Sequence, residues 1–176
     1  MPDTPAIRIA RLQSSDAADY RTLMLAAYAL HPDAFTSTAQ EREQQPLSWW
    51  AARIGAEDDA GEQVIGAWVD GTLAGVVGVS YERRAKTRHK SGLFGMYVAA
   101  PFRQLGLGRQ LVEAALALAR QRDGVRLMQL TVSEGNASAL RLYQSCGFML
   151  FGTEPYAVQH EGRFISKLHL WRDLHG

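Results

Sequence analysis

The sequence contains very little cysteine, very little net charge and no long apolar run. Its one cysteine, Cys146, cannot form a disulfide within the chain. The net charge of +1 does not suit a protein built mainly to bind nucleic acid or an anionic membrane. No stretch approaches the roughly 18 apolar residues that span a bilayer, and no apolar leader follows a basic N-terminus. These absences predict a cytoplasmic protein that binds small molecules, with neither nucleic acid nor a membrane as a partner.

Metal ligands and covalent nucleophiles are also missing as recognisable patterns. Cys146 directly precedes a glycine at an expected helix end, and no histidine can be paired with it from the sequence. The spacing H-E-x-x-H, or any other common metal-ligand spacing, is absent among the five histidines, which stand at 31, 89, 160, 169 and 175. We therefore expect no metal and no covalent intermediate.

What the sequence does contain is one continuous alternation of strand and helix patterns. Its 176 residues, 47% of them hydrophobic, fit a single domain over residues 1–176 with a substantial core. Neither an internal repeat nor a linker divides it. Helical apolar spacing predicts helices over 14–30, 40–56, 104–120 and 136–146. Alternation and turn signals predict strands over 6–12, 63–84 (two strands around the Asp70–Gly71 turn), 92–99, 126–132, 148–157 and 163–171.

This order of elements predicts an α/β (α+β) fold with a mixed sheet. Short connections between successive strands predict antiparallel pairing in the first part of the sheet. The helix over 104–120 separates two strands, and such a crossover connects parallel neighbours. We therefore expect one parallel pair, made by the strands over 92–99 and 126–132.

Two glycines open the helix over 104–120, in the pattern Arg103-x-x-Gly106-x-Gly108. A dinucleotide-binding G-x-G-x-x-G motif requires glycine at position 111, which is Leu111. A P-loop requires Gly-Lys-Ser/Thr, whereas Gly108 is followed by Arg109 and a glutamine. Both of these nucleotide-binding motifs are therefore excluded.

The same helix start has no side chain suited to cap it. From Val98 to Val112 there is no Ser, Thr, Asp, Asn or Glu, so the first backbone N–H groups and the positive end of the helix dipole have no local partner. Glycines let a ligand approach the backbone closely, and a phosphate would supply the missing negative cap. The alternative is a glycine N-cap whose exposed amides bind water.

Two segments carry a resemblance to a known family. "GMYVAAPFRQLGLGRQLVEAAL" resembles the acetyl-CoA-binding segment of the GNAT (GCN5-related) N-acetyltransferase superfamily, and "NASALRLYQSCGF" resembles its later motif of an Asn, a helix with a Tyr and then Gly-Phe. Both occur in the family's order, and the resemblance covers nearly the whole chain. It implies a GNAT-like fold: about four helices around a central, largely antiparallel sheet of six to seven strands, splayed between the strands over 92–99 and 126–132.

The resemblance also implies an acetyl-CoA-dependent N-acetyltransferase whose acetyl-CoA-binding core lies at about 63–148. In the family, backbone amides of the first motif hold the CoA pyrophosphate and the preceding strand pairs with the pantetheine arm. An asparagine near the pantetheine matches Asn136, which would also serve simply as an N-cap. The residues implied for cofactor binding are Met96, Tyr97, Val98, Arg103, Gln104, Leu105, Gly106, Leu107, Gly108, Arg109, Asn136 and Tyr143.

Tyr143 matches the family's tyrosine that protonates the leaving CoA thiolate, a transfer that a phenol can make. The alternative is a core tyrosine whose hydroxyl lies at the surface. Many family members carry a glutamate base on the strand equivalent to 92–99, where this sequence has no acid. Candidate bases are Glu134, Tyr97 and a water relay.

The expected acceptor is a primary amine, most readily that of a small molecule, attacking acetyl-CoA directly in a ternary complex. A protein or peptide acetyltransferase and a non-catalytic acetyl-CoA-binding module are the alternatives. The chain is expected to be a monomer or a homodimer.

Overall fold

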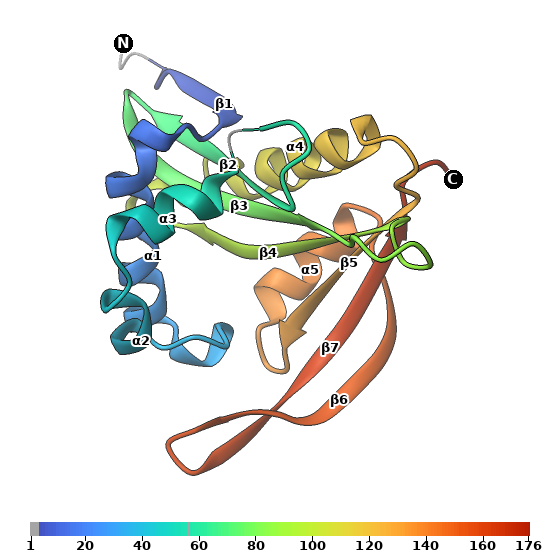
Figure 1. Cartoon of the computed structure of the whole chain (residues 1–176). Coiled ribbons are helices and arrows are strands. Elements are labelled where there is room, and N and C mark those ends of the chain that lie inside the picture. The colour runs from blue at the N-terminus through green and yellow to red at the C-terminus, as the bar shows by residue number, and fades with distance from the viewer. Residues whose placement is uncertain (1–3, 56) are drawn as a thin grey trace.

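One sheet joins all seven strands of the part of the chain that the structure describes, residues 4–55 and 57–176 of a computed structural model. The strand order is β1-β2-β3-β4-β5-β7-β6 (Figure 1). Only β4 and β5 pair in parallel, so the predicted mixed, largely antiparallel sheet is confirmed. The strands are β1 Ile7–Arg11, β2 Glu62–Val69, β3 Thr72–Tyr81, β4 Lys90–Val98, β5 Leu127–Ser133, β6 Met149–His160 and β7 Arg163–Asp173.

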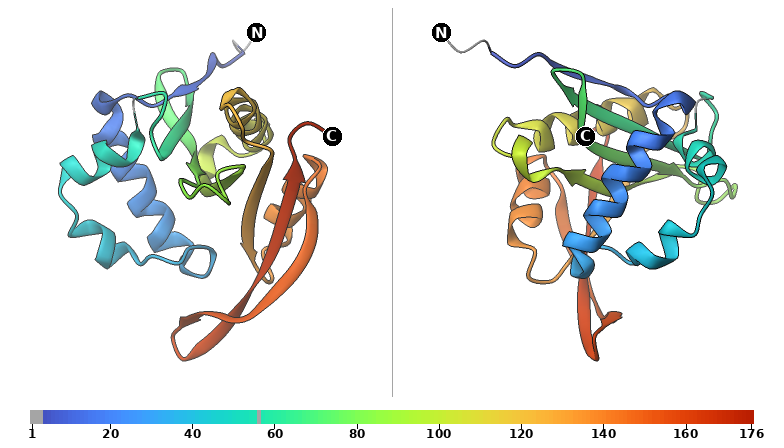
Figure 2. Two further views of the ribbon diagram at one scale, coloured as in Figure 1. Left: turned by 45° about the vertical axis from the view of Figure 1, so that its right-hand side comes forward. Right: turned by 90° about the vertical axis from the view of Figure 1, so that its left-hand side faces the viewer.

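Helices cover the two faces of this sheet in two groups. The first group, α1 and α3, packs on β2 and β3 from one face, and α4 packs on β2, β3 and β4 from the other, beside α5 (Figures 1 and 2). The helices are α1 Ala17–Leu30, α2 Ala39–Glu43, α3 Leu47–Ile54, α4 Leu107–Gln121 and α5 Ala137–Ser145, with short 3₁₀ turns η1 Ser14–Asp16, η2 Pro32–Ala34 and η3 Ala100–Phe102. No helix in the described residues is long and apolar enough to cross a membrane.

Two predicted helices differ from those observed. The helix expected over 40–56 is two helices, because Pro46, with its fixed φ and missing N–H, interrupts the helical pattern and occupies the N-cap position of α3. Residue 56 lies outside the described residues. The helix expected from 104 begins at Leu107, since Gln104 and Gly106 adopt left-handed backbone conformations with φ of 73° and 72°.

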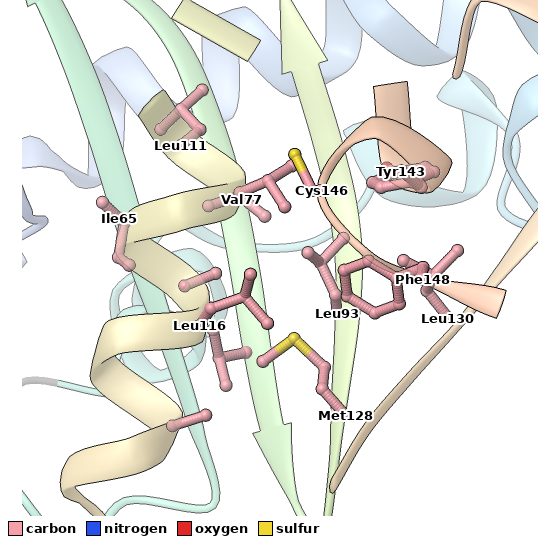
Figure 3. Packing of buried hydrophobic residues seen from close by; sticks show 14 of the residues in the cluster. Ile65, Val77, Leu93, Leu111, Leu116, Met128, Leu130, Tyr143, Cys146 and Phe148 are labelled. Carbon is pink, nitrogen blue, oxygen red and sulfur yellow. The ribbon is translucent and has the colours of Figure 1, made fainter. Parts of the chain in front are cut away.

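Separate hydrophobic clusters fill the space between the sheet and each group of helices. On the α4 face, Leu111 and Leu116 pack against Val77 of β3, and Figure 3 shows the cluster continuing to Met128 and to Phe148, beside α5. On the α1 face a second cluster includes the fully buried Trp50, Tyr20 and Met24. The strands β2 and β3 are therefore packed on both faces, and β4 continues this packed part of the sheet.

The sheet opens between β4 and β5. These strands pair only over Lys90–Gly92 and residues 127–129, and then separate, as the resemblance predicted. A bulge interrupts β4 beyond the paired part: Phe94 lies opposite Gly78 and Tyr97 opposite Val76, with two residues of β4 facing one of β3 between them. The bulge includes Gly95, whose φ of +56° suits glycine. The gap beside it exposes the backbone edge of β4.

Candidate active site

A cavity of about 550 Å³ lies between the open edge of β4 and the helices α4 and α5. Below it is called the donor cavity. Of the residues implied for cofactor binding, only Leu105 is not among its lining residues, and that side chain is 37% exposed. The other eleven line it together: Met96, Tyr97, Val98, Arg103, Gln104, Gly106, Leu107, Gly108, Arg109, Asn136 and Tyr143. Residues from two motifs that are distant in the sequence thus line one cavity.

The start of α4 opens into the donor cavity without a side-chain cap. A Cβ atom added at Gly106 would meet no atom within 4 Å, so open space lies in front of the backbone there. At Gly108 an added Cβ would lie 3.2 Å from Leu142 Cδ2 and 3.4 Å from Met96 Cε, against the cavity wall. The uncapped amides, the helix dipole and the close approach permitted by glycine together suit an anion such as a phosphate.

Two arginines flank this helix start. Arg109 donates to Ser145 Oγ at 3.1 Å and pairs with Glu113 at 3.3 Å. Arg103 donates through Nε to the Val98 carbonyl at 3.3 Å, and its Nη2 lies 3.1 Å from His31 Nε2. Because a guanidinium only donates hydrogen bonds, His31 Nε2 must be the acceptor in this contact, which leaves the proton on Nδ1. Sequence reasoning missed His31, which belongs to no motif and is brought to the cavity by the end of α1.

Tyr143 lies where the donor cavity meets the gap in the sheet. Its side chain is 7% exposed, and its hydroxyl donates to Met96 Sδ at 3.4 Å, across to β4. The hydroxyl is therefore bonded inside the protein. The alternative of a plain core tyrosine predicted a hydroxyl at the surface. Burial, and to a lesser degree the neighbouring Cys146, raises the pKa of Tyr143 above its ordinary value. The phenol stays protonated and available as a donor at neutral pH.

Tyr143 also lines a second cavity, of about 200 Å³. Below it is called the acceptor cavity. The two cavities are neighbours, because six residues line both of them: Ala34, Phe35, Met96, Asn136, Ala139 and Tyr143. The acceptor cavity is further lined by the loop at 34–36, by β4 around Gly95, by β5 and by Lys167 of β7. Lys167 was not predicted from the sequence, because the last strand carries no motif.

Glu134, the predicted base, lies in a third cavity, of about 420 Å³. Its neighbours there include His31 and Asp33, and its side chain is exposed. Neither Tyr143 nor Lys167 lines this cavity. The structure therefore does not bring Glu134 together with the tyrosine.

Asn136 connects the three cavities, because it lines each of them. It also caps α5, since its Oδ1 accepts from the Ala139 N–H at 3.3 Å and from the Ser138 hydroxyl at 3.3 Å. The capping role predicted as an alternative is thus present. Its side-chain N–H groups have no partner among these capping contacts.

The chain resembles known acetyltransferases in sequence. A family model described as the acetyltransferase (GNAT) family matches residues 24–148. The L-amino acid N-acetyltransferase AaaT of Escherichia coli is 24% identical over 123 residues, which are 70% of this chain and 74% of that protein. An L-methionine sulfoximine/L-methionine sulfone acetyltransferase of Pseudomonas aeruginosa is 34% identical over 71 residues, 40% of this chain and 41% of the relative. Mycothiol acetyltransferase of Brachybacterium faecium is 28% identical over 160 residues, and the chain spans only 46% of its length.

Solved structures share the fold over nearly the whole chain. An acetyltransferase of the GNAT family from Streptococcus pneumoniae has a TM-score of 0.76 at 25% identity, with 96% of this chain and 99% of that chain covered. The yncA protein of Salmonella typhimurium, solved with its cofactor acetyl-CoA, has a TM-score of 0.78 at 23% identity, with 96% and 94% covered.

Proposed function

The chain belongs to the acetyltransferase (GNAT) family, and from this premise we propose that it transfers the acetyl group of acetyl-CoA to the primary amine of a small molecule. The observation that carries the proposal is the uncapped, glycine-containing start of α4, which opens into the same cavity as the buried hydroxyl of Tyr143. An anion site and a proton donor on one cavity are what a CoA thioester and its leaving thiolate require. Residues 1–176 would act as one unit.

For binding, the amides of residues 104–109 would hold the diphosphate of CoA. The open edge of β4 at Met96–Val98 would pair with the pantetheine arm, since β5 has already separated from it there. This arrangement supports a thioester placed in the gap, beside Tyr143. Backbone amides of β4 would polarise its carbonyl as negative charge develops on the oxygen.

For chemistry, the neutral amine attacks the thioester carbon, a C–N bond forms and the C–S bond breaks. Tyr143 gives its hydroxyl proton to the sulfur and regains one from solvent. The surplus proton on nitrogen leaves through water. Glu134 would receive it only through such a relay, because it is exposed and lines the neighbouring cavity.

The size of the acceptor cavity favours a small acceptor over a protein segment. Its volume of about 200 Å³ is below the roughly 300–1,000 Å³ of pockets for drug-sized ligands. The names of two relatives refer to small molecules, L-amino acids in one and mycothiol in the other. A cytoplasmic location and the choice between monomer and homodimer stay predictions from the sequence.

Binding of acetyl-CoA tests the donor side. Replacing Gly108 by valine adds a branched side chain against the cavity wall, and calorimetry should show a large loss of CoA affinity. Gly152→Val is the matched control: Gly152 lies on β6 with no atom within 4 Å of an added Cβ, and this variant should bind CoA normally. If Gly108→Val binds CoA as the parent does, the assignment of the phosphate site is wrong.

Initial-rate kinetics test direct transfer. Intersecting double-reciprocal lines for acetyl-CoA and an active amine are expected, because both substrates must be present before the acetyl group moves. Parallel lines together with an acetylated Cys146 would overturn direct attack. A panel of peptides run in parallel decides between the small-molecule proposal and a peptide acetyltransferase, and free-thiol release that no acceptor stimulates would indicate a module that does not transfer the group.

A further inference from the structure

Lys167 is the one charged side chain among the residues that line the acceptor cavity. The polar groups around it are neutral: the hydroxyls of Thr36, Thr131 and Ser133 and the amide of Asn136. No carboxylate lines the cavity to balance the ammonium. A molecule that enters this cavity therefore meets a single positive charge, from Lys167, and the side chain of Tyr143.

The ammonium of Lys167 has N–H groups beyond the one that it uses in its hydrogen bond to Thr36. It donates to Thr36 Oγ1 at 2.6 Å, and since an ammonium carries three N–H groups, two remain. Among the described residues, none of the ion pairs within 4.0 Å includes Lys167. Glu154 lies opposite Lys167 in the β6–β7 register, but its carboxylate is 2.8 Å from His169 Nε2.

The acidic group of the neighbouring loop is also engaged elsewhere. Asp33 pairs with Arg163 at 3.3 Å and lines the cavity of Glu134, not the acceptor cavity. A half-buried ammonium with only a hydroxyl as its partner gains most from an anion that enters with the ligand, because a charge-assisted hydrogen bond is stronger than a neutral one. The same charge disfavours a second cation nearby, so a simple ammonium would bind poorly here.

Within the proposed acetyl transfer, on which this step rests, we infer that the acceptor is a small amino acid whose carboxylate binds Lys167 while its amine faces Tyr143. The lining residues set this orientation, since Tyr143 lines both the donor and the acceptor cavity, whereas Lys167 lines only the acceptor cavity. Lys167 is thus a specificity-determining residue: it selects the acceptor and leaves the transfer itself to Tyr143.

The test compares amino acids with their own amides, which keep the amine and side chain and lose the negative charge. KM is expressed as the concentration of neutral amine, because an amide lowers the pKa of the neighbouring amine. The parent protein should prefer the free acids. In Lys167→Met, KM for the acids should rise roughly ten- to a hundred-fold, as for loss of a hydrogen bond to a charged group, with little change for the amides.

Two further variants separate charge from general damage. Lys167→Arg keeps the charge and should restore most of the preference for acids. Lys86→Met removes one lysine from the exposed loop between β3 and β4, outside every cavity described above, and should behave as the parent. Calorimetry with CoA checks that each variant still folds, and the comparison of acids with amides in the parent needs no variant at all.

Equal KM values for acids and amides in the parent would overturn the inference and leave the acetyl transfer standing. An unchanged KM in Lys167→Met would also overturn it. If the protein binds acetyl-CoA but acetylates no amine, with or without a carboxylate, the proposed function and this inference both fail.

Discussion

The two ends of the sheet differ sharply in burial. In β2 seven of the eight residues are buried, whereas no residue of β6 is buried. Helices cover β2 and β3 on both faces, while the β6–β7 hairpin extends beyond the rest of the molecule (Figures 1 and 2). Large apolar side chains such as Tyr156 and Phe164 are 74% and 57% exposed on the hairpin. One sheet thus combines a packed scaffold with an exposed strand pair.

The candidate active site lies at the boundary between these two regions. Its donor side is made by β4, α4 and α5, which belong to the packed part, and its acceptor side includes Lys167 on the exposed strand pair. A tightly packed core transmits strain, so substitutions there should change stability and the donor site together. Substitutions on the hairpin should change the acceptor preference alone. Four predictions test this contrast, from the largest expected effect to the smallest.

Removal of a core side chain should have the largest effect. Leu116 on α4 is 2% exposed, and Leu116→Ala should lower the free energy of unfolding by about 2–5 kcal/mol, from lost burial and the cavity left behind. Denaturant unfolding followed by circular dichroism measures it. A loss below about 1 kcal/mol would mean that the packed end of the sheet is less tightly packed than its burial indicates.

Loss of the Tyr143 hydroxyl should reduce catalysis and leave the scaffold intact. Tyr143→Phe should lower kcat by roughly 100-fold, the usual contribution of a general acid, with CoA affinity nearly unchanged. The matched control is Tyr156→Phe, which removes a hydroxyl from an exposed tyrosine on the hairpin and should leave kcat unchanged. An unaltered rate in Tyr143→Phe, measured where chemistry limits turnover, would return this residue to a purely structural role.

Alkaline pH should destabilise the packed region through Tyr20. Burial raises the pKa of Tyr20 to about 12, so the unfolded chain ionises at a lower pH than the folded one. Stability from this group is complete below the ordinary pKa of about 10 and is lost as pH rises toward 12, by about 2–3 kcal/mol. Between pH 9 and 12 the free energy of unfolding should therefore fall less steeply with pH for Tyr20→Phe than for the parent. Identical slopes would contradict the raised pKa of Tyr20.

A change on the exposed hairpin should have the smallest effect on stability. Among the aromatic pairs of the described residues, Phe164 takes part in one, with the exposed ring of Tyr156 at a centroid distance of 4.9 Å. Phe164→Ala should change the free energy of unfolding by less than about 1 kcal/mol. The same denaturant assay as for Leu116→Ala gives a direct comparison. A loss of more than about 2 kcal/mol would show that the hairpin is part of the cooperative core.

Local patterns predicted much of the fold, and where they were wrong the reason is physical. Alternation and turn chemistry located the β2–β3 hairpin around Asp70–Gly71, because both the strand period and the turn are local properties. The prediction of one helix over 40–56 was wrong, because Pro46 interrupts a pattern of apolar residues that is otherwise helical. The absence of capping residues before α4 is likewise visible in the sequence and is confirmed by the structure.

By itself, the sequence determined the order of the strands and the places of α1, α4 and α5 among them, the uncapped start of α4, and the two motifs that meet at Tyr143. Each of these is encoded by neighbours along the chain. Only the tertiary structure decided which residues line the acceptor cavity together with Tyr143. Lys167 and Thr36 are 131 residues apart and touch because β7 inserts between β5 and β6. The hydrophobic periodicity of the sequence does not predict such a contact, because pairing between strands far apart in the chain depends on the assembly of the whole sheet. The acceptor side of the site is formed by that assembly.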